Sequence, residues 1–214
     1  MNPLRAHRIG VVALLAFTGA LAVAGLLACS GKEDTSGSAQ SSATVVTVTA
    51  PTGLRWLSFQ CVDLPIADQG PERIEGPVAS GFDRSPVGAA LAAIHSTVRM
   101  SIATDSQWPT VGQRMLAEGR GRDSWATARA QISITAPITS GAPKVAGYVI
   151  AHYTLDATDV DLYTIHPDNS ITRNNAHVLW HGGDWRLQLP DNATSPPVTT
   201  AAVLPADIVA FAPR

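Results

Sequence analysis

The spacing of the apolar side chains changes from a helical to a strand-like period along this chain. Between residues 87 and 102, large aliphatic side chains recur every three or four residues, at Val87, Leu91, Ile94, Val98 and Ile102. This spacing places one apolar stripe on a helix and leaves Ser96 and Arg99 outside it. Ser85 and Pro86 are the residue types favoured at a helix N-cap and at the first helical position. The sequence therefore predicts a helix that begins at Pro86.

From Gln131 onward, apolar and polar residues alternate, which is typical of strands. The clearest pair is 176–180 and 185–189, which flank a short turn centred on two glycines and predict an antiparallel hairpin. Trp180 and Trp185 are expected to face each other across this hairpin. Helices first and strands afterwards predict an α+β fold, in which a long N-terminal helix and shorter helices pack on a curved, cone-like antiparallel β-meander.

The first residues of the chain have the order of an export signal. Arg5 and Arg8 precede an apolar run over 9–28. The run ends in Leu26-Leu27-Ala28-Cys29-Ser30, which resembles the lipobox of bacterial lipoproteins and implies cleavage between Ala28 and Cys29 and acylation of the Cys29 thiol. The alternative is an uncleaved transmembrane helix, since ~20 apolar residues span a bilayer. Both readings place the rest of the chain on the outer face of the cytoplasmic membrane, because basic flanks stay inside.

Composition divides the chain after the export signal. Residues 29–50 are rich in Ser, Thr and Gly and are expected to form a flexible tether. Residues 51–214 are expected to form a single α+β domain with an irregular C-terminal tail. Removal of residues 1–28 takes two arginines from the fifteen basic residues and leaves thirteen against seventeen acidic ones, a net charge of −4. We therefore expect no nucleic-acid partner, because such a partner requires a basic patch.

The sequence predicts no catalytic residue, no metal site and no cofactor. His177 and His181 lie four residues apart on one expected strand, which separates their Cα atoms by ~13 Å. A histidine of one strand could meet a carboxylate of another, such as His152 and Asp161, but no ligand-spacing motif is present. No serine lies in a Gly-x-Ser-x-Gly elbow. Once Cys29 is acylated, Cys61 is the remaining thiol and is expected to be a small buried apolar residue.

Two segments carry a resemblance to a known family. The first runs from Leu64-Pro65 through Gly70-Pro71 to Gly81-Phe82-Asp83-Arg84-Ser85-Pro86-Val87-Gly88-Ala89-Ala90. The second is Val178-Leu179-Trp180 with Gly183-Asp184-Trp185-Arg186-Leu187. These segments resemble an actinobacterial domain-of-unknown-function family of exported proteins, whose members often lie near conjugative or integrative-element genes. The resemblance implies a fold similar to the cone of nuclear transport factor 2-like domains and assigns no activity. Conjugation scaffolds with such domains usually have a true membrane helix, whereas this chain has a lipobox-like segment.

Three functional hypotheses follow from these features. The leading one is a non-catalytic, membrane-anchored lipoprotein domain that binds an envelope protein or itself, with Arg84, Trp180 and Trp185 as candidate interaction residues. The second is a lipoprotein that binds a small apolar ligand or a lipid in a pocket. The third is a cone-fold enzyme of the isomerase or dehydratase type, which requires a buried Asp or His at the pocket floor.

Overall fold

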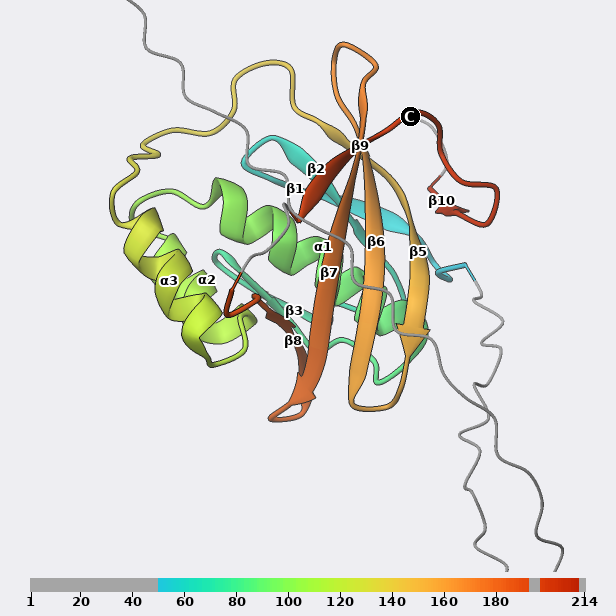
Figure 1. The fold of residues 1–214 in the computed structure, drawn as a ribbon, viewed down its shortest axis with the longest axis horizontal. Helices are drawn as coiled ribbons and strands as arrows, with labels where there is room; N and C mark the ends of the chain where they lie inside the picture. The colour runs from blue at the N-terminus through green and yellow to red at the C-terminus, as the bar shows by residue number, and fades with distance from the viewer. Residues whose placement is uncertain (1–49, 193–196, 212–214) are drawn as a thin grey trace, which may run out of the picture. The chain divides into compact units, whose positions relative to one another are not determined.

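The computed structural model describes residues 50–192 and 197–211. Four strands come first within these ranges, β1 (Arg55–Phe59), β2 (Val62–Ile66), β3 (Arg73–Glu75) and β4 (Val78–Ser80). The helices follow as α1 (Pro86–Ile102), α2 (Trp108–Met115) and α3 (Arg120–Arg129). The remaining strands are β5 (Lys144–Tyr153), β6 (Ala157–Ile165), β7 (Ile171–His181), β8 (Asp184–Gln188), β9 (Val198–Ala201) and β10 (Val209–Ala210) (Figure 1).

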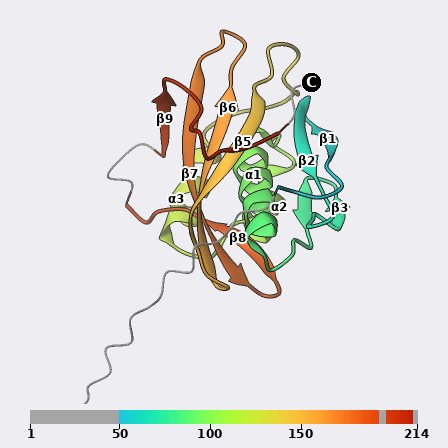
Figure 2. The ribbon, with the colours of Figure 1, turned by 90° about the vertical axis from the view of Figure 1, so that its right-hand side faces the viewer.

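The later strands form one antiparallel sheet in the order β10-β5-β6-β7-β8. β9 also pairs with β7, along 171–174, so β8 and β9 occupy different lengths of the same β7 edge. Helix α1 lies between this sheet and the β1–β2 and β3–β4 hairpins (Figure 2). The helix is therefore covered on two sides, and the core of the domain surrounds it.

Helix α1 begins where its sequence provides a cap. Ser85 has an extended backbone, and its hydroxyl oxygen accepts a hydrogen bond from the Gly88 N–H at 3.1 Å. Pro86 occupies the first helical turn, where its missing N–H costs nothing. Four alanines of the helix have no exposed surface, and they let both neighbouring layers approach the helix closely: Ala89, Ala90, Ala92 and Ala93. Burial thus extends beyond the predicted stripe.

The predicted α+β class with a long N-terminal helix is wrong. More of the described residues lie in strands than in helices, and four strands precede the first helix. Residues 54–66 fold back at Gln60 and Cys61, which take positive φ angles of 50° and 66°. Residues other than glycine are uncommon at positive φ angles. Because neither position is a glycine, the sequence carried no turn signal there. Helix α1 also does not pack on a meander alone, because it lies between the main sheet and the two hairpins.

The expected signal peptide (1–28), the cleavage site at Ala28 and Cys29, and all but the last residue of the tether lie outside the described residues. None of the helices within 50–192 and 197–211 has both the length and the apolar content that a bilayer crossing requires.

Replacing the α1 cap tests how much this junction stabilises the domain. We expect Ser85→Ala to lower the free energy of unfolding by about 1 kcal/mol, because the Gly88 N–H loses its acceptor. Ser101→Ala is the matched control, since the exposed Ser101 hydroxyl only donates to the Thr97 carbonyl inside the same helix. Urea unfolding followed by circular dichroism measures both variants. Equal losses for the two serines would contradict a special role of the cap.

Candidate functional site

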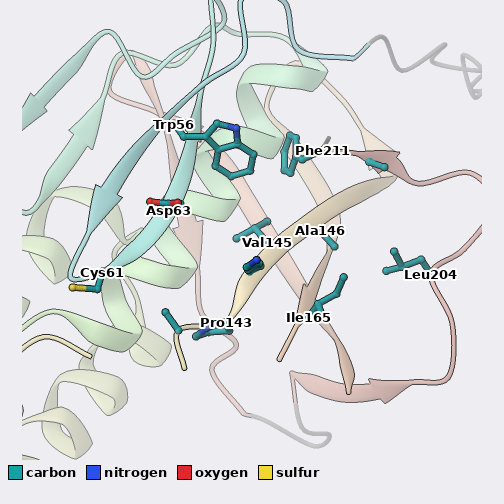
Figure 3. Close-up of a pocket in the computed structure, with 12 residues that line it drawn as sticks. Trp56, Cys61, Asp63, Pro143, Val145, Ala146, Ile165, Leu204 and Phe211 are labelled. Carbon is teal, nitrogen blue, oxygen red and sulfur yellow. The ribbon is translucent and has the colours of Figure 1, made fainter. Parts of the chain in front are cut away.

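An apolar groove of about 730 Å³ opens at one edge of the main sheet (Figure 3). The β1–β2 hairpin forms one wall, and the start of β5, the end of β6 and the C-terminal segment form the others. Its lining residues are Trp56, Cys61, Asp63, Ala142, Pro143, Lys144, Val145, Ala146, Ile165, Leu204, Ala210 and Phe211. Most of these side chains are apolar, so the groove offers a surface that favours a nonpolar ligand.

The C-terminal wall of the groove depends on a close backbone approach. β10 pairs with β5 at Gly147 and Tyr148, next to an irregularity in the β5–β6 register after Val145. A Cβ atom on Gly147 would lie 2.4 Å from the Val209 carbonyl oxygen, so a glycine is required at this position. The Phe211 N–H then donates to the Ala146 carbonyl at 2.8 Å. These bonds hold the last described residues along the groove.

Three aromatic rings join the walls. Phe211 packs edge-on against Trp56, with ring centroids 5.5 Å apart, and tilted against Tyr148 at 5.8 Å. Phe211 is 6% exposed and Tyr148 is fully buried. Burial raises the pKa of the Tyr148 hydroxyl, which has no hydrogen-bond partner among the described residues. The contacts fix the hairpin, β5 and the C-terminal segment relative to one another.

The ionisable groups of the groove are Cys61, Asp63 and Lys144. Cys61 is exposed at the tip of the β1–β2 turn, so the expectation of a buried cysteine was wrong. Asp63 and Lys144 are also exposed, on β2 and at the first position of β5. The described lining residues thus include no buried Asp or His of the kind that the enzyme hypothesis requires at a pocket floor.

The structure brings the three candidate interaction residues together at the opposite end of the sheet. Trp180 and Trp185 are directly paired between β7 and β8, with ring centroids 5.4 Å apart in an edge-to-face arrangement. The Arg84 guanidinium lies 5.2 Å from the centroid of the Trp180 ring. The cross-strand tryptophan pair is confirmed, and Arg84 extends it as a cation–π contact.

The polar groups of this cluster are bonded within the chain. Arg84 Nε donates to the Leu155 carbonyl at 2.9 Å, and its guanidinium forms an ion pair with Asp156. Trp185 Nε1 donates to the Asp83 carbonyl at 2.9 Å. The cluster therefore attaches the segment before α1 to the sheet, and its use as a binding surface for a partner stays a prediction.

Asp184 is a residue of this region that the sequence did not indicate. Its carboxylate accepts hydrogen bonds from the N–H groups of Gly81 at 2.7 Å, Phe82 at 3.1 Å and Trp185 at 2.9 Å. The glycine turn before Asp184 had suggested a simple hairpin loop. These bonds join the two sequence segments that carry the family resemblance, which are distant along the chain and in contact in the fold.

A histidine and an aspartate meet on the sheet, at a different register from the one considered above. His177 Nδ1 lies 2.6 Å from Asp159 Oδ1 across β6 and β7. His152 is also opposite Asp159, whereas Asp161 is opposite Val149. No group of three or more His, Cys, Asp or Glu side chains within the described ranges is arranged to hold a metal ion.

A family model matches most of this chain. Residues 20–204 match the model of a family described as a domain of unknown function (DUF8175). The chain belongs to this family. Neither a curated protein nor a solved structure matches this chain. The match confirms the expected membership of an uncharacterised family, and it includes most of the groove but not Ala210 and Phe211.

A buried polar pair lies in the core of this family member, away from the groove. His95 Nε2 is 2.8 Å from the Pro65 carbonyl oxygen, and Arg99 Nε donates to His95 Nδ1 at 3.3 Å. Arg99 also donates to the Pro77 carbonyl at 3.0 Å, and its guanidinium lies 4.3 Å from the Phe59 ring centroid. Burial, with a contribution from the Arg99 charge, lowers the pKa of His95 to about 3.

This pKa predicts a pH-dependent stability. Unfolded His95 takes up a proton as the pH falls below its usual pKa of 6.5, whereas folded His95 stays neutral until about 3. Stability should therefore fall with decreasing pH in this window, by up to about 1.4 kcal/mol per pH unit from this group. His95→Gln should remove that contribution, and exposed His152→Gln should not. Urea unfolding over a pH series measures the difference, and parallel profiles for wild type and His95→Gln would contradict it.

Proposed function

We propose that this chain is an extracytoplasmic lipoprotein, anchored to the membrane through Cys29, whose groove binds a small apolar molecule or a lipid. The observation that carries the binding proposal is the groove of about 730 Å³ with its largely apolar lining. Its volume lies within the range of about 300–1,000 Å³ that is typical of small-molecule sites. The anchor is supported by the basic and apolar export segment and by the lipobox-like residues before Cys29.

The lining accounts for the energy that such binding requires. Each methylene group that moves from water into an apolar surrounding gains about 0.8 kcal/mol. An alkyl chain of about eight methylenes would gain roughly 6 kcal/mol, against which the loss of ligand freedom has to be set. The aromatic contacts of Trp56 and Phe211 hold the walls in place before a ligand arrives, so binding need not order them.

The anchor suits a ligand that comes from the membrane. A tether of about twenty residues spans at most ~70 Å when fully extended. The groove of an anchored chain would therefore stay within reach of the bilayer surface. This geometry favours an apolar molecule that is supplied by the envelope over one that is dissolved in the medium.

A second function, protein interaction or assembly, is favoured by one edge of the sheet. β9 pairs with β7 and with no other strand within the described residues. Two large apolar side chains in or near β9 are exposed, Val198 at 47% and Val203 at 74%. An open edge with apolar side chains can accept a strand of another chain. The finer resemblance, to an actinobacterial family near conjugation genes, supports such an assembly role, and a concentration-dependent dimer in analytical ultracentrifugation would be its first sign.

Labelling with a palmitate precursor tests the anchor. We expect the wild-type chain to incorporate the label in a bacterial host that processes lipoproteins, and Cys29→Ser to incorporate none, because the acylated thiol is lost. Cys61→Ser is the matched control and should incorporate as much label as the wild type, since Cys61 lies in the folded domain. Label that persists in Cys29→Ser would exclude a Cys29 anchor.

Filling the groove tests the binding function. Ala146→Trp places a large side chain in the groove, and Ala151→Trp places the same side chain on the exposed part of β5. We expect organic extraction of the purified full chain to release an apolar compound from the wild type and from Ala151→Trp. Ala146→Trp should release at least tenfold less, measured by mass spectrometry. Equal amounts from the two variants would show that the compound binds elsewhere.

A further inference from the structure

We infer that the ligand of the groove is a single-chain amphiphile with an anionic head group, a long-chain carboxylate, and that Lys144 selects for the negative charge. This inference rests on the proposed function and specifies its ligand. It comes from the distribution of charge around the groove rather than from the existence of the groove itself.

Among the residues that the structure describes, Lys144 is the single cationic side chain that lines the groove. It is exposed at the first position of β5, and it forms no ion pair with any residue that the structure describes. Several arginines elsewhere in the domain are paired with carboxylates, as Arg84 with Asp156, and Arg114 with Glu75 at 2.7 Å. The Lys144 ammonium is thus available to an anion at the rim of the groove.

The acidic and apolar side chains of the groove lining determine where that anion would lie. Asp63 belongs to the hairpin wall, and it already takes part in an interaction within the chain. Trp56 and Phe211 form one part of the lining, and Ile165 and Leu204 lie on the opposite side (Figure 3). An alkyl chain would pack along these apolar side chains, with its charged end at Lys144.

The size of the groove favours a ligand with one alkyl chain over a ligand with two. Its volume of about 730 Å³ falls among sites for single small molecules. A carboxylate on a single alkyl chain matches both the apolar lining and the single cation. A neutral lipid would leave the charge of Lys144 without a role, and a cationic amphiphile would be repelled by it.

The test uses the full chain in vesicles of phosphatidylcholine, which carry no net charge, at alkaline pH. Dodecanoate and dodecanol, each with a photoreactive diazirine on the alkyl chain, are compared by light-induced labelling and peptide mass spectrometry. We expect dodecanoate to label peptides that contain Trp56 or Phe211 at lower concentrations than dodecanol does. Lys144→Gln should raise the half-maximal dodecanoate concentration about three- to fivefold, as for loss of a solvent-exposed ion pair, and leave dodecanol unchanged.

Two control variants separate the effect of a positive charge at position 144 from the effect of the net charge of the protein. Lys144→Arg should retain the preference for dodecanoate. Arg120→Gln removes the same charge from an exposed position on α3, outside the groove lining, and should behave as the wild type. Higher salt should weaken dodecanoate labelling of the wild type and not that of Lys144→Gln, because the charge interaction at the rim is screened.

The outcomes distinguish this inference from the proposed function. Equal labelling of the groove by both probes, with no effect of Lys144→Gln, would overturn the anionic ligand and leave apolar binding intact. Labelling of the groove by neither probe would overturn both. Light-independent association of two chains through the groove, blocked by Ala146→Trp, would assign the surface to a second copy and also overturn the inference.

Discussion

The arrangement of the domain depends on the polar pair His95 and Arg99 inside α1. Both side chains are buried, so their polar atoms must find partners within the protein. The partners are the Pro65 carbonyl in β2 and the Pro77 carbonyl between β3 and β4. One helix turn thereby joins both hairpins to the core. The pair is neutral at His95 and charged at Arg99 at physiological pH, since burial brings the Arg99 pKa down only to about 10.

This attachment also determines where a ligand site can form. Helix α1 lies between the hairpins and the sheet, and its alanines are fully buried there. The groove forms instead where the β1–β2 hairpin extends past the helix towards β5. At the other end of the sheet, the Asp184 carboxylate and the Arg84 ion pair attach the segment before α1. The hairpin wall of the groove is thus held by the core, and the C-terminal wall by β10 and Phe211.

Local signals in the sequence predicted the local structures. Ser85 and Pro86 mark the start of α1, and the tryptophans around the glycine turn mark the β7–β8 hairpin, because in both cases the decisive contacts lie within a few residues. The β1–β2 turn was missed because Gln60 and Cys61 adopt positive φ without a glycine. Arg99 was placed outside the apolar stripe but is buried, since a single stripe assumes one covered face, whereas α1 has two.

The groove could not be predicted from the sequence, for a different reason. Its walls come from residues near 56, 145 and 211, and the pairing of β10 with β5 is a contact between distant segments that no periodicity reveals. The family match ends at residue 204, so Trp56, Lys144 and Leu204 belong to the shared domain while Phe211 lies beyond it. A binding function common to the family would therefore depend on the hairpin and β5 walls. The wall formed by Phe211 lies outside the matched residues, and it contributes to the shape of the apolar end of the site rather than to its charge.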